Sequence, residues 1–349
     1  MSPELQLVAD LCRRAFVRAG CSKLRVPADM DWDRVQRLAH FHRVKGLVSQ
    51  SLSSLTASPP SGVKEAFAVE GRAIAVTNLR AAAECRDIRL DFDAAGVPLL
   101  FLKGLTLGAL AYSKPLLKMG WDIDVLVAPG QVSTAGDILQ RRGYRLSIPE
   151  SLGKLENWHR QRKESLWAHD NGLFVELHSR LADNASLIPS IDIRSPSRTV
   201  DVADGIRLPT LEDDYLFAYL CVHGASSAWF RLKWITDLVG FIHDLPASEI
   251  ERLYGRSQEL GAYRAADQAL LLADAIYGSL EGTSLRSRLA GDRGSQRLFR
   301  AAMRQIIDAR EPTGRRLGTW RIHWTQLLLK RGMTFKVSEA FRQVRDFIA

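Results

Sequence analysis

The most constraining feature of this chain is a pair of carboxylates inside an apolar run. Asp122 and Asp124 interrupt the segment 120–127, whose other residues are mostly hydrophobic. On a β-strand, residues i and i+2 point to the same face, so the two aspartates would project together. Two adjacent carboxylates need a cation, and Mg²⁺ binds a few carboxylate oxygens together with waters and phosphates. The pattern predicts a strand that carries a metal site for phosphate chemistry.

A second motif lies upstream of the aspartates. The apolar segment Val97–Leu102 indicates a short strand, and helical spacing resumes at 105–112 after Lys103 and Gly104. A glycine at this point lets backbone N–H groups approach an anion at the start of a helix. Strand, glycine and helix together predict a phosphate-binding turn.

A third polar insertion lies downstream, in the apolar segment 174–178. Glu176 and His178 share one face of this predicted strand, which follows an Asn-Gly hairpin signal at 171–172. A third carboxylate on a neighbouring strand is what the aspartate pair needs to complete a metal site. Two interpretations of His178 stay open: a hydrogen-bond partner of a metal-ligating carboxylate, or a core histidine.

Periodicity divides the chain into three regions. Residues 1–62 are predicted as helical, over 5–17 and 33–55, and end in a Ser/Pro/Gly cluster. Residues 63–208 combine a long helix, 64–95, with the predicted strands. Residues 209–349 are predicted as helical throughout, and the fold class is therefore α+β, a mixed sheet flanked by helices.

The C-terminal region begins with a pattern that resembles a capping box, Thr210 followed by Asp213. A single long helical segment is predicted from Tyr215 to Ile242. His223, Lys233 and Asp237 would then fall on one broad face of it. The further helices are predicted at 247–260, 265–277 and 296–309.

Charge and cysteine content restrict the partners. The net charge is +9, and residues 310–349 hold nine Lys or Arg against three acidic residues. A solvated basic face is the simpler interpretation, whereas nucleic-acid binding with Trp320, His323 and Trp324 is the alternative. The four cysteines lack CxxC spacing, which argues against a zinc site or a disulfide framework. No secretory signal and no membrane-spanning run is visible, so we expect a cytoplasmic protein with no membrane partner.

Lys103-Gly104, Asp122-Ile123-Asp124, Glu176-Leu177-His178 and the segments 220–224 and 232–237 together resemble one family. It is the bacterial uncharacterised nucleotidyltransferase branch of the polymerase-beta-like nucleotidyltransferase superfamily. The resemblance covers roughly residues 32–242.

The resemblance implies a polymerase-beta-like core in which Asp122, Asp124 and Glu176 are the catalytic residues and bind Mg²⁺ or Mn²⁺. A helical domain would close over a nucleoside triphosphate. Lys103 and Gly104 stand where the superfamily has a Gly-Ser phosphate element, although eighteen residues before the first aspartate. Lys118 stands where the branch tends to have an arginine, and a lysine meets phosphate as a point charge.

On the predicted helix face, Lys233 would reach the triphosphate and His223 would line the cleft. The alternative for Lys233 is a surface ion pair with Asp237, four residues on. Trp229 and Trp234 are expected to pack in the core rather than to stack on a base.

The expected function is magnesium-dependent transfer of a nucleoside monophosphate to a hydroxyl or phosphate acceptor on a small molecule, peptide or protein. Two alternatives remain: a non-catalytic nucleotide-binding protein on the same fold, and an RNA-binding protein that adds nucleotides.

Overall fold

The computed structural model describes residues 1–16, 23–120, 122–310 and 320–348. Its centre is a five-stranded mixed sheet in the order β1-β2-β5-β4-β3. The strands are β1 (Leu100–Phe101), β2 (Asp122–Leu126), β3 (Arg145–Ile148), β4 (Glu164–Ala168) and β5 (Phe174–His178). β2 and β5 run parallel, and the other neighbours are antiparallel. The predicted α+β class, with a mixed sheet flanked by helices, is confirmed.

The alternation of apolar and polar side chains along β2 and β5 fixes the register between these two strands. Ile123 and Val125 on β2, with Val175 and Leu177 on β5, are buried in one hydrophobic cluster. Because side chains alternate between the two faces of a sheet, a slip of one residue would drive the polar side chains of β2 into this cluster. The apolar face therefore positions the polar face, which carries Asp122 and Asp124.

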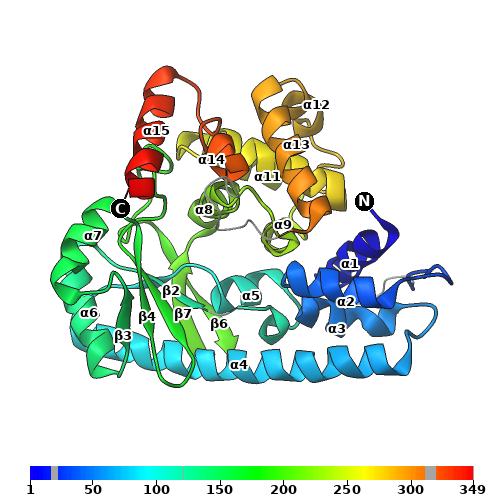
Figure 1. The fold of residues 1–349 in the computed structure, drawn as a ribbon, viewed down its shortest axis with the longest axis horizontal. Coiled ribbons are helices and arrows are strands. Elements are labelled where there is room, and N and C mark those ends of the chain that lie inside the picture. Colours follow the sequence, from blue (N-terminus) through cyan, green and yellow to red (C-terminus); the bar gives the residue numbers. More distant parts are fainter. Residues whose placement is uncertain (17–22, 121, 311–319, 349) are drawn as a thin grey trace.

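A helix of 34 residues, α4 (Ser61–Ala94), runs along one side of the whole molecule (Figure 1). Its C-terminal half packs against the sheet through Ile88 and Phe92, and its first half contacts α3 (Lys45–Ser51). The predicted helix 64–95 is confirmed with a start three residues earlier.

The other helices of the sheet region are α5 (Leu105–Ala111), which follows β1, and two helices that flank the sheet, α6 (Val132–Arg141) and α7 (Leu155–Gln161). α6 packs into the same hydrophobic cluster as the C-terminal half of α4, through Ile138 and Leu139. The sheet is thus enclosed by helices on this face, and its polar face remains for the site.

Two strands were missed by the sequence analysis. β6 (Ser197–Ala203) and β7 (Ile206–Leu211) form an antiparallel hairpin beside β1 and α5. The capping box proposed at Thr210 is wrong, because Thr210 is a fully buried residue of β7 and the helix that follows is preceded by Glu212. Pro209 lies within β7, a strand of a two-stranded sheet, where a missing backbone donor is tolerated.

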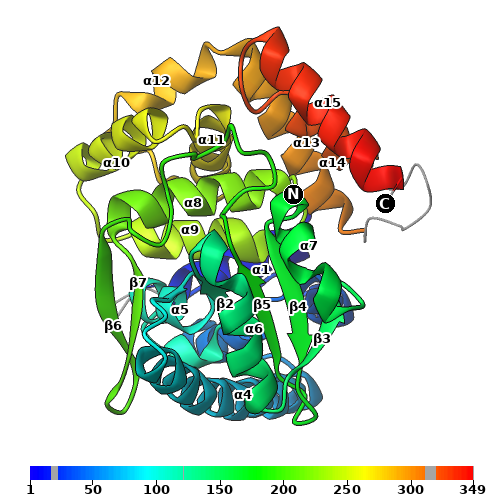
Figure 2. The same ribbon diagram turned by 90° about the vertical axis from the view of Figure 1, so that its left-hand side faces the viewer.

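The N-terminal and C-terminal helices share one hydrophobic core. It joins residues of α1 (Pro3–Arg14), α2 (Trp32–Phe41) and α3 to residues of α8 (Asp213–Ser226) and α9 (Leu232–Ile242). Figure 2 shows these C-terminal helices stacked on the side of the sheet opposite α4. The remaining helices are α10 (Ala247–Glu259), α11 (Arg264–Tyr277), α12 (Leu285–Ala290), α13 (Arg293–Asp308), α14 (Trp320–Gln326) and α15 (Met333–Ile348). The domain boundaries at residues 62 and 208 stay a prediction.

The long helix predicted over 215–242 is wrong in one respect, because it is broken into α8 and α9. Ala228 and Trp229 have positive φ angles of 47° and 54° and reverse the chain. The ring of Trp229 is fully buried on Gly224, where an added Cβ would lie 2.4 Å from ring carbons. A glycine at this position therefore permits the packing that ends α8. Core packing is confirmed for Trp229.

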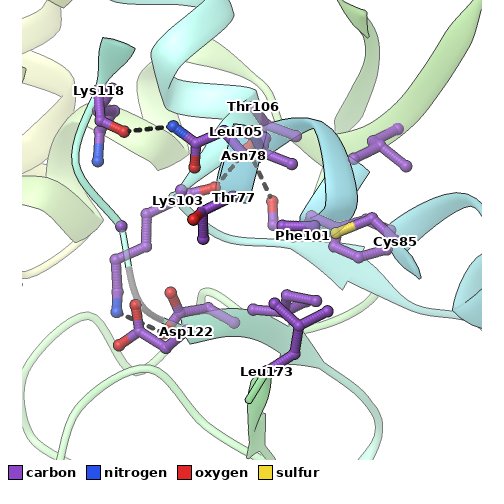
Figure 3. Close-up of a pocket in the computed structure, with 16 residues that line it drawn as sticks. Thr77, Asn78, Cys85, Phe101, Lys103, Leu105, Thr106, Lys118, Asp122 and Leu173 are labelled. Atoms are coloured by element: carbon purple, nitrogen blue, oxygen red, sulfur yellow. Dashed lines mark hydrogen bonds and ion pairs between the residues drawn. The ribbon is translucent and has the colours of Figure 1, made fainter. Parts of the chain in front are cut away.

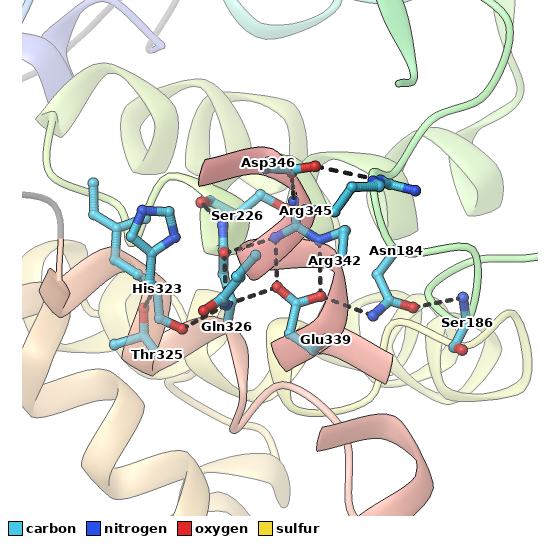
Figure 4. A network of polar contacts seen from close by, with 12 residues as sticks. Asn184, Ser186, Ser226, His323, Thr325, Gln326, Glu339, Arg342, Arg345 and Asp346 are labelled. Atoms are coloured by element: carbon cyan, nitrogen blue, oxygen red, sulfur yellow. Dashed lines mark hydrogen bonds and ion pairs between the residues drawn. The ribbon is translucent and has the colours of Figure 1, made fainter. Parts of the chain in front are cut away.

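The C-terminal segment is tied to the rest of the molecule by the polar contacts in Figure 4. Asn184 donates to Glu339 at 2.8 Å, and the Gln326 amide donates to the carbonyl of Ser226, also at 2.8 Å. Arg342 pairs with Glu339 and Asp346. Part of the basic charge of residues 310–349 is thus neutralised within the fold, while residues 311–319 and 349 lie outside the described ranges. Nucleic-acid binding by this segment stays a prediction.

Within the described ranges, no helix is both long enough and apolar enough to cross a bilayer. Cys12, Cys85 and Cys221 are buried free thiols, as expected for cysteines without a ligand pattern. Cys21 lies outside the described residues.

Candidate functional site

The aspartate strand places its polar face beside Glu176. β2 and β5 are parallel neighbours, and Asp124 pairs directly with Glu176 in the register of the sheet. Asp124 is 4% exposed, whereas Asp122, at the start of the strand, is more accessible. The predicted strand around the aspartates is confirmed, and so is the placement of Glu176 on a neighbouring strand.

The tightest group of potential metal ligands is Asp124, Glu176 and His178. One ligand atom from each lies within 4.8 Å of the others. The His178 Nε2 atom is 3.2 Å from Asp124 Oδ1 and 3.6 Å from Glu176 Oε2, and its Nδ1 atom is 3.3 Å from Glu164 Oε2. Of the two interpretations of His178, the structure supports a partner of the site carboxylates. Asp122 is not in this group, and the ligand roles of Asp122, Asp124 and Glu176 stay a prediction.

Lys103 lies among the carboxylates of the site rather than beside them. Its ammonium contacts Asp124 Oδ1 and lies 3.8 Å from Glu176 Oε2. The backbone around it is fixed, because Leu102 N–H donates to the carbonyl of Asp124 at 3.1 Å and the Thr106 hydroxyl donates to the carbonyl of Lys103 at 3.0 Å. The expected phosphate lysine is therefore a direct partner of the aspartate strand.

Gly104 begins α5 with φ +62° and ψ −120°. This conformation is strained for residues with a Cβ. The turn after β1 thus needs the glycine that the sequence analysis singled out.

The charged side chains of this cluster shift one another's pKa values. Burial disfavours the carboxylate of Asp124, but Lys103 and the hydrogen bond from His178 hold its pKa well below the ordinary value. Burial also disfavours a charged His178, yet Asp124 and Glu164 raise its pKa. Burial and then the nearby charge of Asp124 raise the pKa of Glu176, although the His178 imidazole, 3.6 Å away, opposes this. Such pKa shifts are frequent at functional sites.

A second buried pair borders the site. The Lys118 ammonium lies 3.3 Å from Asp237 Oδ2, and the Tyr112 hydroxyl donates to Asp237 Oδ1 at 2.6 Å. Asp237 is 6% exposed, so the proposed surface pair between Lys233 and Asp237 is wrong. The reason is that the break between α8 and α9 turns Asp237 inward, toward the loop before β2.

Two residues that support the site were missed. The side chain of Asn78, on α4, donates to the carbonyls of Leu116 and Lys118 at 2.7 and 2.8 Å. His42 Nδ1 accepts from the N–H of Leu232 at 3.0 Å, at the start of α9. The only signal for Asn78 in the sequence is a polar residue on the buried side of an amphipathic helix, and His42 left none.

Lys233 is the least compensated of the site lysines. Among the described residues, no carboxylate lies within ion-pair distance of its ammonium. Burial, with a further contribution from the charge of Lys118, lowers its pKa to about 8. His223 is similarly affected: burial and the nearby charges of Lys103 and Lys163 hold its pKa well below the ordinary value, so the ring is neutral.

Two adjoining pockets share the polar floor of the site. One is lined by seven of the eight predicted site residues, all except Glu176: Lys103, Gly104, Lys118, Asp122, Asp124, His223 and Lys233. The turn between α8 and α9 brings His223 and Lys233 together there, although not on a single helix face. Trp234 also lines this pocket.

The other pocket lies against α4, with Thr77, Asn78 and Cys85 in its wall (Figure 3). Both pockets include Lys103 and Asp122. A ligand in either one therefore meets carboxylates on the strand and lysine ammonium groups around them.

A comparison with protein families gives one match. The model of a family described as uncharacterised nucleotidyltransferase matches residues 28–278, more than half of the chain. A comparison with curated proteins found no match.

Proposed function

Because the chain belongs to the uncharacterised nucleotidyltransferase family, we propose that it transfers a nucleoside monophosphate from a nucleoside triphosphate to an acceptor. The acceptor group is a hydroxyl or phosphate of a small molecule, peptide or protein, and the reaction depends on Mg²⁺ or Mn²⁺. The observation that carries the proposal is the pocket in which Asp122 and Asp124 face Lys118 and Lys233.

The donor set fits a divalent cation. Asp122, Asp124 and Glu176 supply carboxylate oxygens, which hard cations prefer. The Asp124 Oδ2 atom is buried and, among the described residues, has no hydrogen-bond partner. This oxygen is therefore available as a metal ligand. These three residues would hold the metal. When bound, it neutralises phosphate charge and lowers the pKa of a coordinated hydroxyl.

The lysines and the two pockets would bind the substrates. Lys233 and Lys118 line the pocket with His223 and would bind the triphosphate by charge. The acceptor would enter from the adjoining pocket against α4, which meets the first pocket at Asp122 and Lys103. Two substrates held in adjoining pockets that meet at Asp122 and Lys103 would be oriented for in-line attack on the α-phosphorus, and such positioning supplies much of the catalytic advantage.

One observation favours a second candidate, a nucleotide-binding protein without turnover. The Lys103 ammonium contacts Asp124 and faces Glu176, so these carboxylates already have a cation. A protein that binds nucleotide through Lys118 and Lys233 but does not release pyrophosphate would match this arrangement.

Purified protein, magnesium and α-labelled nucleoside triphosphates, incubated with a panel of hydroxyl and phosphate acceptors, test both candidates. We expect pyrophosphate release and labelled acceptor, and a loss of at least about a hundredfold for Asp122→Asn or Asp124→Asn. Turnover that is unchanged in the variant carrying both substitutions would rule out the transferase. Nucleotide binding without turnover over the whole panel would favour the second candidate.

A further inference from the structure

The Lys103 ammonium lies where two carboxylates and a histidine converge. It contacts Asp124 Oδ1 and is 3.8 Å from Glu176 Oε2, and the same Asp124 oxygen lies 3.2 Å from His178 Nε2. Its side chain is 14% exposed. The ammonium is thus enclosed among groups that would also be the ligands of a bound metal.

The backbone of Lys103 is held by hydrogen bonds, while its side chain borders a pocket into which it could rotate. Hydrogen bonds from Leu102 and Thr106 hold the residue against β2. The side chain borders both pockets, one of which also contains Lys233 and His223. Rotation of the side chain would therefore carry the ammonium from the carboxylates toward the lysine-lined pocket without moving the strand.

A divalent cation shared by Asp124 and Glu176 would lie next to this ammonium. A charge of +2 and a charge of +1 a few ångströms apart repel strongly in a site largely shielded from water, and both compete for the same oxygens. Asp124 Oδ2 is the one oxygen of this carboxylate that has no hydrogen-bond partner among the described residues.

We infer that Lys103 is the resident counter-ion of Asp124 and Glu176, and that a divalent cation must displace its ammonium before it can bridge the two carboxylates. The inference rests on the proposed function in that it assumes metal binding at this strand. The displaced ammonium would join Lys233 in the pocket assigned to the triphosphate. Metal binding and nucleotide binding would then be coupled through one side chain, since each favours the same position of Lys103.

The test is Mn²⁺ binding to the full chain in the absence of nucleotide, measured by the electron paramagnetic resonance signal of free Mn²⁺. We expect Lys103→Met to bind Mn²⁺ about tenfold more tightly than the wild type, because a competing charge is removed. Lys103→Arg keeps the charge and is expected to bind as weakly as the wild type.

Lys163→Met is the matched control. Lys163 pairs with Glu164 at the edge of the same polar group, so its removal changes the net charge equally without freeing Asp124. We expect its Mn²⁺ affinity to stay within about threefold of the wild type. A charge that does not compete for the ligand oxygens affects the metal only by longer-range repulsion, which distance and salt weaken.

A second readout is thermal unfolding. Without metal, Lys103→Met leaves Asp124 and Glu176 with less compensating charge, so its Tm should fall below that of the wild type. Added Mn²⁺ should then raise the Tm of this variant more than that of the wild type, because at a given concentration a ligand that binds only the folded state stabilises it more the more tightly it binds.

Equal or weaker Mn²⁺ binding by Lys103→Met, with measurable binding by the wild type, would overturn the inference and leave the proposed function intact. Tight binding by Lys103→Arg would also overturn it, because charge would not be the cause. Absence of Mn²⁺ binding in every variant would overturn both the inference and the metal dependence of the proposed function.

Discussion

Asp124 and Glu176 face each other as a register pair on two parallel strands, and a lysine and a histidine reach both of them. The two carboxylates come from segments about fifty residues apart in the sequence. The sheet alone brings them together, because the two strands pair edge to edge and place both carboxylates on the same face. The site is therefore built on rigid backbone rather than on a loop.

Nucleotide binding should weaken as pH rises through about 8 if Lys233 binds the triphosphate. Its folded pKa is lowered to about 8, so the ammonium is present below that pH and is lost above it. Between pH 7 and 9, we expect the affinity for a magnesium–nucleoside triphosphate complex to fall by up to about tenfold. Calorimetric titration at several pH values measures this.

Lys233→Arg is the control for that prediction, because a guanidinium stays protonated over this range. Its affinity should be flat with pH. A wild-type affinity that does not change between pH 7 and 9 would argue against a role for Lys233.

Asp237→Ala should destabilise the fold by about 3–5 kcal/mol, because it leaves the buried Lys118 ammonium unpaired. It also removes the acceptor of the Tyr112 hydroxyl. Urea unfolding gives the free-energy change. Replacing both partners, with Lys118→Met and Asp237→Leu, should recover most of the loss, and a double variant as unstable as Asp237→Ala would contradict this explanation.

Gly104→Ala should cost about 1–3 kcal/mol of stability through backbone strain alone. The φ angle of Gly104 is +62°, while an added Cβ would approach only one atom, the carbonyl oxygen of Asp122, at 3.7 Å. Gly130→Ala, at a position with no positive φ and open space around it, serves as the control. Equal stability of the two variants would show that the turn relaxes without strain.

Asn78→Ala should destabilise the protein by about 2 kcal/mol or more, because the carbonyls of Leu116 and Lys118 lose their shared donor. The exposed neighbour on the same helix, Thr77→Ala, should change stability by less than about 0.5 kcal/mol. Chemical unfolding of the two variants side by side measures the difference. A small effect at Asn78 would mean that water replaces its amide.

Local patterns predicted the strands and the acidic residues of the site. Alternation around Asp122 and Asp124, and again around Glu176, is a signal of period two that lies within five residues. The glycine after Lys103 marked a turn for the same local reason. The parallel pairing of β2 with β5 confirmed that these short patterns meet in space.

Contacts between distant segments were beyond such patterns. The pairing of Lys118 with Asp237 depends on the direction in which α9 leaves the turn after α8, and at this turn Trp229 packs on Gly224. His42 supports the start of α9 from 190 residues away. None of these contacts leaves a periodic signal, so apolar spacing over 215–242 predicted one helix where there are two.

The core that α1, α2 and α3 share with α8 and α9 sets the order in which a growing chain can become stable. The first three helices leave the ribosome early, but many of their apolar partners, those in α8 and α9, are encoded beyond the sheet region. Until α8 and α9 have been synthesised, Leu11, Val35 and Val48 have only part of their hydrophobic cluster available, including residues of α4, β1 and α5. The core around the N-terminal helices is therefore completed late in translation, and a chaperone that shields these helices meanwhile would raise the yield of the protein.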